Sequence, residues 1–227
     1  MKTTIIIGGS KGIGKAVLQN LILHSKVINI SRTAPNLSHK NLIHYSCDVL
    51  KDQLPNIELA DNIIYCLGSI NLKPFSRLSL EDFKDDFEIN VLGAIKVIQA
   101  YLPILKKGVN PSILLFSSVA TKLGMPFHAS ISVAKSGVEG LVKSLGAELA
   151  PTIRINAIAP TVTNTELASK LLRNDKITTS IKERHPLKKI LEPKEVANMA
   201  EFLISDKASS QSGQIFNMDC GIVSFKI

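Results

Sequence analysis

The chain has 227 residues, of which 45% are hydrophobic and 20% are charged, and its formal net charge is +8. A chain of this length and composition can bury the core of one globular domain, and its apolar runs are too short and too interrupted to predict a membrane span. Lysines and arginines are scattered and only 5% of the residues are aromatic, which argues against a nucleic-acid partner and favours small anionic ligands.

The predicted elements alternate between strands and helices along residues 1–227, which we interpret as a single domain. Nearly continuous runs of Val, Ile and Leu are typical of parallel strands buried on both faces. Such runs cover residues 4–7, 26–30, 43–46, 62–67, 112–116, 154–159 and 214–218. Helical spacing of apolar residues covers 15–24, 80–105, 131–149 and 193–205. The alternation predicts an α/β fold, a doubly wound sheet of about seven mainly parallel strands with helices on both faces.

Three connections differ from the rest. Residues 31–40 have little helical pattern, and only a turn or two fits between residues 48 and 61, so we expect few helices on that side of the sheet. Residues 161–191 are polar and rich in Thr and Lys. A long excursion late in an α/β chain commonly covers a ligand, and we expect 161–191 to cover the substrate.

The cysteines and the N-terminus bear on the compartment. Cys47, Cys66 and Cys220 form no metal-binding or disulfide motif, which predicts reduced thiols and no metal site. A strand is predicted almost at Met1, so no signal peptide is expected. These features together predict a cytoplasmic protein.

The first predicted strand ends in a glycine-rich turn that leads into a helix. Its sequence is Gly8-Gly9-Ser10-Lys11-Gly12-Ile13-Gly14. Glycines permit positive φ and let a ligand approach the backbone, and the N-terminus of the following helix directs unpaired N–H groups at the gap. The turn therefore predicts phosphate binding, with a plain turn as the alternative.

This spacing resembles that of the short-chain dehydrogenase/reductase family, and further segments match the family in the same order. Residues 88–93 resemble the helix with the catalytic Asn, here Asn90, and 113–120 resemble the strand that ends in the catalytic Ser, here Ser118. Residues 134–141 resemble the helix after the catalytic Lys, here Lys135, and 154–160 and 212–221 resemble the last two strands. The chain is identified as a member with a Rossmann-type sheet that resembles the carbonyl and acyl-carrier-protein reductases.

The resemblance implies a dinucleotide cofactor, and the second strand bears on which one. This strand ends in Asn29-Ile30-Ser31-Arg32, without the acid that holds the ribose hydroxyls of NAD. Arg32 and Lys11 suit a 2′-phosphate, so NADP(H) is expected rather than NAD(H); surface charges are the alternative. Asp48 resembles the acid beside the adenine ring, with a loop-capping Asp as the rival interpretation. The expected cofactor residues are Gly8, Ser10, Lys11, Gly12, Ile13, Gly14, Arg32, Asp48, Val49, Gly68, Lys135, Pro160, Thr161, Thr163 and Thr165.

The family's chemistry needs four residues, and this chain has three of them. In the family, Ser positions the substrate carbonyl, Tyr exchanges the proton, Lys holds the nicotinamide ribose and lowers the Tyr pKa, and Asn supports a water leading to Lys. Asn90, Ser118 and Lys135 are present, but the tyrosine position, four residues before Lys135, holds Ile131. The chain's tyrosines are Tyr45, Tyr65 and Tyr101, and none lies in this segment.

Two further departures lie near the expected cleft. The family's Asn-Asn-Ala-Gly is here Tyr65-Cys66-Leu67-Gly68, which predicts the loss of polar side chains that brace the sheet, and the glycine after Pro160 is Thr161.

His128 lies seven residues before Lys135, on the same face if the helix extends that far. Some enoyl reductases of the superfamily place their tyrosine there, so His128 is a candidate proton donor; a loop histidine is the alternative.

Two functions remain open. The first is NADPH-dependent reduction of a carbonyl or activated double bond of a small molecule, with atypical proton delivery. The second is an NADP(H)-binding member that is catalytically silent because of Ile131, acting as a sensor or a partner subunit. The resemblance implies a homodimer or homotetramer formed through helices 80–105 and 131–149.

Overall fold

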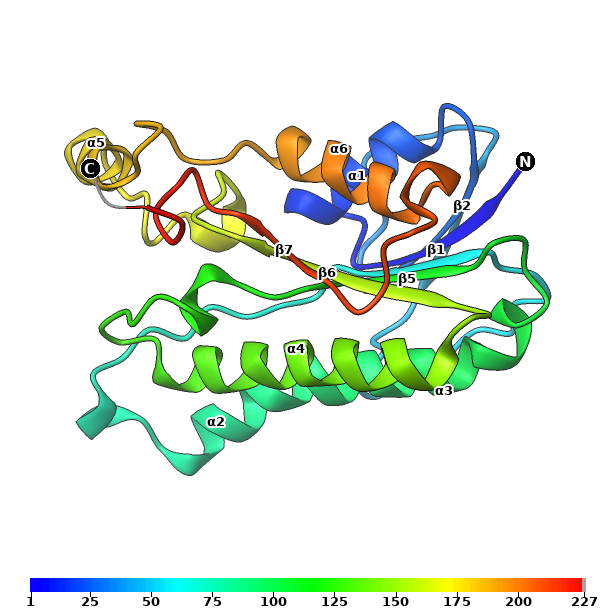
Figure 1. The fold of residues 1–227 in the computed structure, drawn as a ribbon, viewed down its shortest axis with the longest axis horizontal. Coiled ribbons are helices and arrows are strands. Elements are labelled where there is room, and N and C mark those ends of the chain that lie inside the picture. The colour runs from blue at the N-terminus through cyan, green and yellow to red at the C-terminus, as the bar shows by residue number, and fades with distance from the viewer. Residues whose placement is uncertain (226–227) are drawn as a thin grey trace.

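A parallel sheet runs through the centre of the molecule, with helices above and below it (Figure 1). The computed structural model describes residues 1–225. Within them seven strands lie in the order β3-β2-β1-β4-β5-β6-β7, and each neighbouring pair is parallel. Their bounds are β1 Thr3–Ile7, β2 Lys26–Ser31, β3 Leu42–Ser46, β4 Asn62–Tyr65, β5 Ser112–Phe116, β6 Arg154–Pro160 and β7 Ile215–Met218. The predicted doubly wound α/β fold is confirmed as a single Rossmann-like domain.

Two layers of helices cover the sheet. Helices α1 (Gly12–Leu21) and α6 (Pro193–Ile204) pack together on one face, and α2 (Leu80–Phe87), α3 (Gly93–Leu105) and α4 (Ala129–Leu149) cover the other (Figure 1). Successive strand residues point to opposite faces. Ile5 and Ile7 of β1 therefore join the core beneath α3 and α4, while Ile6 joins the core beneath α1 and α6. As predicted, the described chain forms no helix between β2 and β3 or between β3 and β4.

One helix is not predicted by the sequence pattern. Helix α5 (Asp175–Arg184) lies within the excursion 161–191, beyond the carboxyl ends of the strands (Figure 1). The Asn174 side chain accepts a hydrogen bond from the N–H of Ile177 and so caps its N-terminus. Helix α5 buries none of its own residues, so it lacks the apolar stripe by which the other helices are recognised.

The stretch Leu80–Leu105 is long and apolar enough to cross a membrane by length and composition alone. However, 44% of its most apolar window is buried inside the fold. Val97, Ile98 and Leu105 of this stretch belong to the core between the sheet and the α2–α4 layer. Its packing is that of a core helix.

The same stretch is interrupted by a π turn, Glu88–Leu92, that joins α2 to α3. The N–H of Gly93 donates to the carbonyl of Glu88, which leaves the carbonyl of Ile89 free. The hydroxyl of Tyr65, at the end of β4, donates to that Ile89 carbonyl at 2.6 Å. The expectation that the sheet loses a polar brace here is therefore wrong at Tyr65, whose hydroxyl provides one. A Cβ on Gly93 would lie 2.2 Å from Tyr65 Oη, so glycine is what lets the turn approach.

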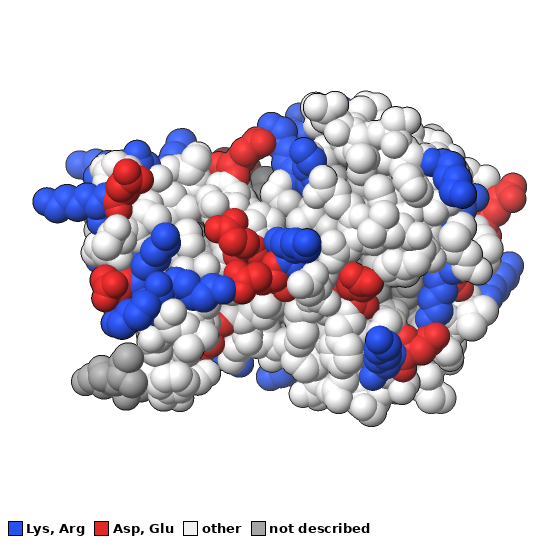
Figure 2. Space-filling view, turned by 90° about the horizontal axis from the view of Figure 1, so that it is seen from above, with Lys and Arg blue, Asp and Glu red and all other residues white. Residues whose placement is uncertain are grey.

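Charges are mixed on the face that carries α1 and α6. Figure 2 shows Lys and Arg interspersed with Asp and Glu there, with no continuous basic stripe across the view. This distribution agrees with the scattered basic residues of the sequence.

The Tyr65–Gly93 contact makes a prediction about stability. Tyr65→Phe leaves a buried carbonyl without its donor and should lower the free energy of unfolding by about 1–3 kcal/mol. Gly93→Ala should cost about as much through overpacking, but less in the Tyr65→Phe background, where the hydroxyl is gone. Urea denaturation of the four proteins measures this cycle. Gly140→Ala, where an added Cβ meets nothing within 4 Å, is the control and should not destabilise; strictly additive costs would contradict the proposed contact.

Candidate active site

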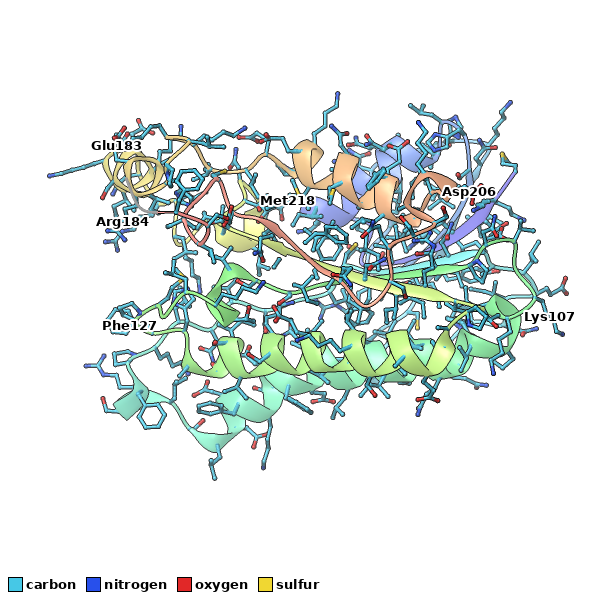
Figure 3. The ribbon with its side chains drawn as sticks, viewed as in Figure 1. Lys107, Phe127, Glu183, Arg184, Asp206 and Met218 are labelled. Atoms are coloured by element: carbon cyan, nitrogen blue, oxygen red, sulfur yellow. The ribbon has the colours of Figure 1, made fainter. Side chains whose placement is uncertain are left out.

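Two adjoining hollows lie at the carboxyl edge of the sheet. The outer cleft, of about 390 Å³, lies over the ends of β1, β2 and β3, and the inner cavity, of about 190 Å³, lies over the ends of β4, β5 and β6. Leu67 and Gly68 line both. Figure 3 shows Phe127 and the α5 residues Glu183 and Arg184 at this end of the molecule, and Lys107 at the opposite end.

The glycine-rich turn forms one wall of the outer cleft. Gly8 has a φ of +84°, and a Cβ on Gly14 would lie 2.2 Å from the Gly8 carbonyl oxygen, so both positions require glycine. Helix α1 starts directly after Lys11, which caps it with no side-chain hydrogen bond, and its first turn holds no acidic residue. The N–H groups of this turn are therefore not engaged by a cap, and this arrangement fits the phosphates of a dinucleotide.

A buried asparagine holds this turn in place. The N–H of Gly9 donates to Asn29 Oδ1 at 2.9 Å, and Asn29 Nδ2 donates to Ser31 Oγ at 3.0 Å. Ser31 Oγ in turn lies 2.6 Å from Ser10 Oγ. The role of Asn29 is not predicted from the sequence, although a polar residue within the apolar strand β2 is the signal that marks it.

The outer cleft carries both predicted cations. Lys11 and the exposed Arg32 line it beside Ser10 and Ser31. Lys11 Nζ pairs with Glu166 Oε2 at 2.8 Å, but both side chains are more than two-thirds exposed, so this ion pair is weak. Arg32 makes no ion pair within residues 1–225.

Asp48 lies in the same cleft and fits both interpretations of its role. Its Oδ1 accepts from the N–H of Leu50 at 3.1 Å, which is the capping of a loop. Asp48 and Val49 also line the cleft, where the resemblance places the adenine ring.

Lys135 brings a charged group into the wall of the inner cavity. It is only 7% exposed, and its Nζ donates to the carbonyl of Phe116 at 2.8 Å. Burial lowers the pKa of Lys135 to about 8, and the negative charge of Asp86 opposes this shift. Cys66 beside it has a pKa raised to about 12, because burial outweighs the effect of the Lys135 charge.

Asn90 lies in the π turn, and its side chain lies close to Gly68 and Lys135. Its Nδ2 donates to the carbonyl of Asp86 at 2.7 Å and to Ser69 Oγ at 3.0 Å. A Cβ on Gly68 would lie 3.4 Å from Asn90 Oδ1 and 3.5 Å from Lys135 Nζ. The amide oxygen and the ammonium therefore face a common point above Gly68, as expected if a water joins them.

Ser118 and Ile131 line the wall of the inner cavity. Ser118 Oγ accepts from the N–H of Ala120 at 3.2 Å, which leaves its own O–H free to donate into the cavity. Ile131 is 5% exposed and fills the tyrosine position with an apolar side chain. The structure thus brings Ser118, Asn90 and Lys135 together without a tyrosine.

His128 precedes α4 directly and lines the inner cavity with Ser118, Ile131 and Lys135. Its Nδ1–H donates to the carbonyl of Pro126 at 2.7 Å, since that carbonyl can only accept. Nε2 is then the ring nitrogen available to the cavity. The side chain is half-buried, so it is neither fully solvated nor part of the core.

The segment after β6 covers the inner cavity. Pro160, Thr161, Thr163 and Thr165 line it together with the later side chains Leu167, Ala168 and Leu171. The buried Thr161 hydroxyl lies 2.7 Å from His185 Nε2, while His185 Nδ1–H donates to the carbonyl of Ile181. Thr161 thus ties the end of β6 to α5, a contact that a glycine could not make.

The remaining predicted cofactor residues, Ile13 and Gly12, lie in different parts of the site. Ile13 lines the inner cavity, whereas Gly12 lies under Thr165, since a Cβ on Gly12 would be 3.3 Å from Thr165 Cγ2. Ser69 and Asp86 also belong to the site and are not predicted from the sequence. Asp86 lies four residues before Asn90, a spacing that puts both on one helix face and is the signal that could identify it.

Comparisons with known proteins find relatives that match most of the chain. The family described as enoyl-(acyl carrier protein) reductase matches residues 38–223. Carbonyl reductase (NADPH) 2 of Sus scrofa is 27% identical over 230 residues, which cover 96% of this chain and 94% of that reductase.

Solved structures share the whole fold. A short chain dehydrogenase family protein from Francisella tularensis has a TM-score of 0.91 and 28% identity, covering 99% of this chain and 100% of its own. A variant of ElxO, with phenylalanine in place of a tyrosine and NADPH bound, has a TM-score of 0.86 and 25% identity over 99% of this chain and 100% of its own.

Proposed function

Since this chain belongs to the short-chain dehydrogenase/reductase family of oxidoreductases, we propose that it reduces a carbonyl or activated double bond with NADPH and a proton donor other than tyrosine. The observation that carries the proposal is a cavity lined by Ser118 and Lys135 that adjoins the glycine-rich cleft, with Asn90 Oδ1 and Lys135 Nζ both close to Gly68 in its wall. Free thiols in a soluble domain agree with the proposed cytoplasmic location.

The outer cleft fits the adenosine end of NADP(H). The turn Gly8–Gly14 would hold the phosphates through backbone N–H groups, and Lys11 and Arg32 would pair with a 2′-phosphate. Asp48 and Val49 would lie beside the adenine. The preference for NADP(H) over NAD(H) rests on Arg32, which follows the end of β2 and has no acidic partner in the described chain.

Within the inner cavity each residue has a separate task. When bound, the reduced nicotinamide supplies a hydride to the substrate. Lys135 would hold the ribose through its ammonium group, and Thr163 and Thr165 would border the nicotinamide. Ser118 would donate its O–H to the substrate oxygen and so stabilise the negative charge that develops there.

The cavity wall also bears on the substrate class. Apolar side chains form much of it, among them Ile70, Leu72, Met125, Val162, Leu167 and Leu171. Lys135 is the one Lys or Arg among the residues of the described chain that line it. An uncharged substrate with an apolar skeleton suits this wall better than an anionic or sugar-like one.

The cofactor proposal is tested by fluorescence titration with NADPH and NADH. Arg32→Ala should weaken NADPH binding by about 10- to 100-fold, the size expected for hydrogen bonds to a charged group, and leave NADH binding unchanged. Lys26→Ala, an exposed lysine at the opposite end of the same strand, is the matched control. Equal losses for both nucleotides would remove the basis for the NADP(H) preference.

Substitution of Ile131 separates the reductase from the silent alternative, which the apolar Ile131 side chain favours. Ile131→Tyr should raise kcat for a carbonyl substrate by about 100-fold or more, because it restores a general acid beside Lys135. Ile131→Phe adds the ring without the hydroxyl and should not. Steady-state kinetics decide the matter: measurable turnover by the unaltered chain supports the reductase, and turnover by Ile131→Tyr alone supports the silent binder.

The α2–α4 layer supports the proposed homo-oligomer. It leaves large apolar side chains exposed, among them Leu80, Phe87, Leu92 and Val133. A symmetric interface would bury such a surface. Light scattering at micromolar concentration should give the mass of a dimer or tetramer, and Val133→Glu on α4 should lower it. A monomeric mass for the unaltered chain would contradict the proposal.

A further inference from the structure

A buried carboxylate stands directly behind the inner cavity. Asp86, on α2, is 2% exposed, and its Oδ1 accepts the hydroxyl proton of Ser69 at 2.5 Å. Ser69 itself lines the cavity that contains Ser118 and Ile131. The Ser69 hydroxyl therefore connects the space where a substrate would lie to a carboxylate shielded from water.

The orientation of Ser69 is fixed by its neighbours. Asn90 Nδ2 donates to Ser69 Oγ at 3.0 Å, so the Ser69 hydrogen is left to point at Asp86. One lone pair of Ser69 Oγ then remains for a donor in the cavity. This is the arrangement of a hydroxyl that accepts a proton on one side and passes one on at the other.

A purely structural role does not require the charge of Asp86. An asparagine could accept the same bond from Ser69 without burying a carboxylate, which is costly away from water. Asp86 Oδ2 has no hydrogen-bond partner within residues 1–225. The titratable groups that act on the neighbouring ammonium of Lys135 are Asp86 from α2 and Cys66 after β4. Asp86 is therefore a negative group held near the cation that the family's chemistry uses.

We propose that Ser69 and Asp86 form the proton path that replaces the missing tyrosine: Ser69 exchanges the proton with the substrate oxygen, and Asp86 holds it. This inference rests on the proposed function and names its proton donor. Ser69 is the catalytic residue in the sense of touching the substrate, and Asp86 acts through it.

Each proton that moves has a donor and an acceptor, both in alcohol oxidation and in carbonyl reduction. In alcohol oxidation the substrate O–H gives its proton to Ser69 Oγ, Ser69 gives its own proton to the Asp86 carboxylate, and the hydride leaves for the oxidised nicotinamide. In reduction the path starts from Asp86 in its protonated form: Ser69 gives its proton to the substrate oxygen as the hydride arrives at the substrate carbon, and the Asp86 carboxyl gives its own proton to Ser69. Once the product has left, water in the cavity returns a proton to the Asp86 carboxylate through Ser69.

Kinetics in both directions test this path with Asp86→Asn and Ser69→Ala. Both variants should lower kcat by about 100-fold or more, the usual worth of a general acid–base group, while the Kd for NADPH stays within about threefold. Asp85→Asn, the exposed neighbour on the same helix, is the matched control and should change neither quantity.

A second measurement needs neither cofactor nor turnover. Nitrogen-15 NMR of the lysine side chains should find Lys135 titrating near pH 8, assigned by its loss in Lys135→Gln. In Asp86→Asn the pKa of Lys135 should fall further, because the opposing negative charge is removed; Asp85→Asn should leave it in place. This readout also confirms that Asp86→Asn is folded.

The outcomes separate failure of this inference from failure of the proposed function. Turnover by the unaltered chain that survives Asp86→Asn, or that His128→Gln abolishes instead, overturns the Ser69–Asp86 path and leaves the reductase intact. An unmoved Lys135 titration in Asp86→Asn overturns it as well. If only Ile131→Tyr turns over, the reductase proposal fails and the path fails with it.

Discussion

An ammonium group kept out of water at the carboxyl edge of the sheet is the constraint on which the rest of this site depends. Lys135 is 7% exposed, and a charge in that position is tolerated only if polar groups replace its hydration. The Phe116 carbonyl accepts from it, and Asp86 opposes the loss of its proton. The surrounding chain therefore brings the Phe116 carbonyl from β5 and the Asp86 carboxylate from α2 near this ammonium, and the π turn adds the Asn90 side chain.

The π turn couples the sheet to the site. Its extra residue frees the Ile89 carbonyl, which the Tyr65 hydroxyl takes up at the end of β4. Asn90, within the turn, bonds to Ser69 and to the backbone of Asp86. A bulge of this kind is costly in a plain helix and is often found at functional sites. Here its cost is offset by the tyrosine and by the close approach that Gly93 permits.

How far the sequence predicts this structure depends on the range of each interaction. The strands, and the helices with an apolar stripe, follow from local patterns, and so does the glycine turn, because close packing and positive φ impose glycine locally. Helix α5 is not predicted because it buries none of its own residues and so shows no apolar stripe. The site roles of Ser69 and Asp86 are not predicted because their polar side chains come together only when the chain after β4 and helix α2 are folded against each other. The bracing role of Tyr65 is not predicted for the same reason, because its hydroxyl finds the Ile89 carbonyl only once β4 and the π turn are folded together.

The departures from the family pattern are not of one kind. Tyr65 replaces a polar brace with another, through Ile89. Thr161 replaces a glycine and gains a buried bond to His185 that anchors α5. Each change is thus compensated by a new contact within the fold. Ile131 differs, because an apolar side chain in the cavity wall cannot supply the proton that a tyrosine would, whatever packs around it. The scaffold and the glycine-rich cleft thus keep the form of the family, while Ile131 removes a side chain that the family's chemistry uses, and Ser69, with the Asp86 carboxylate behind it, lines the same cavity as Ile131.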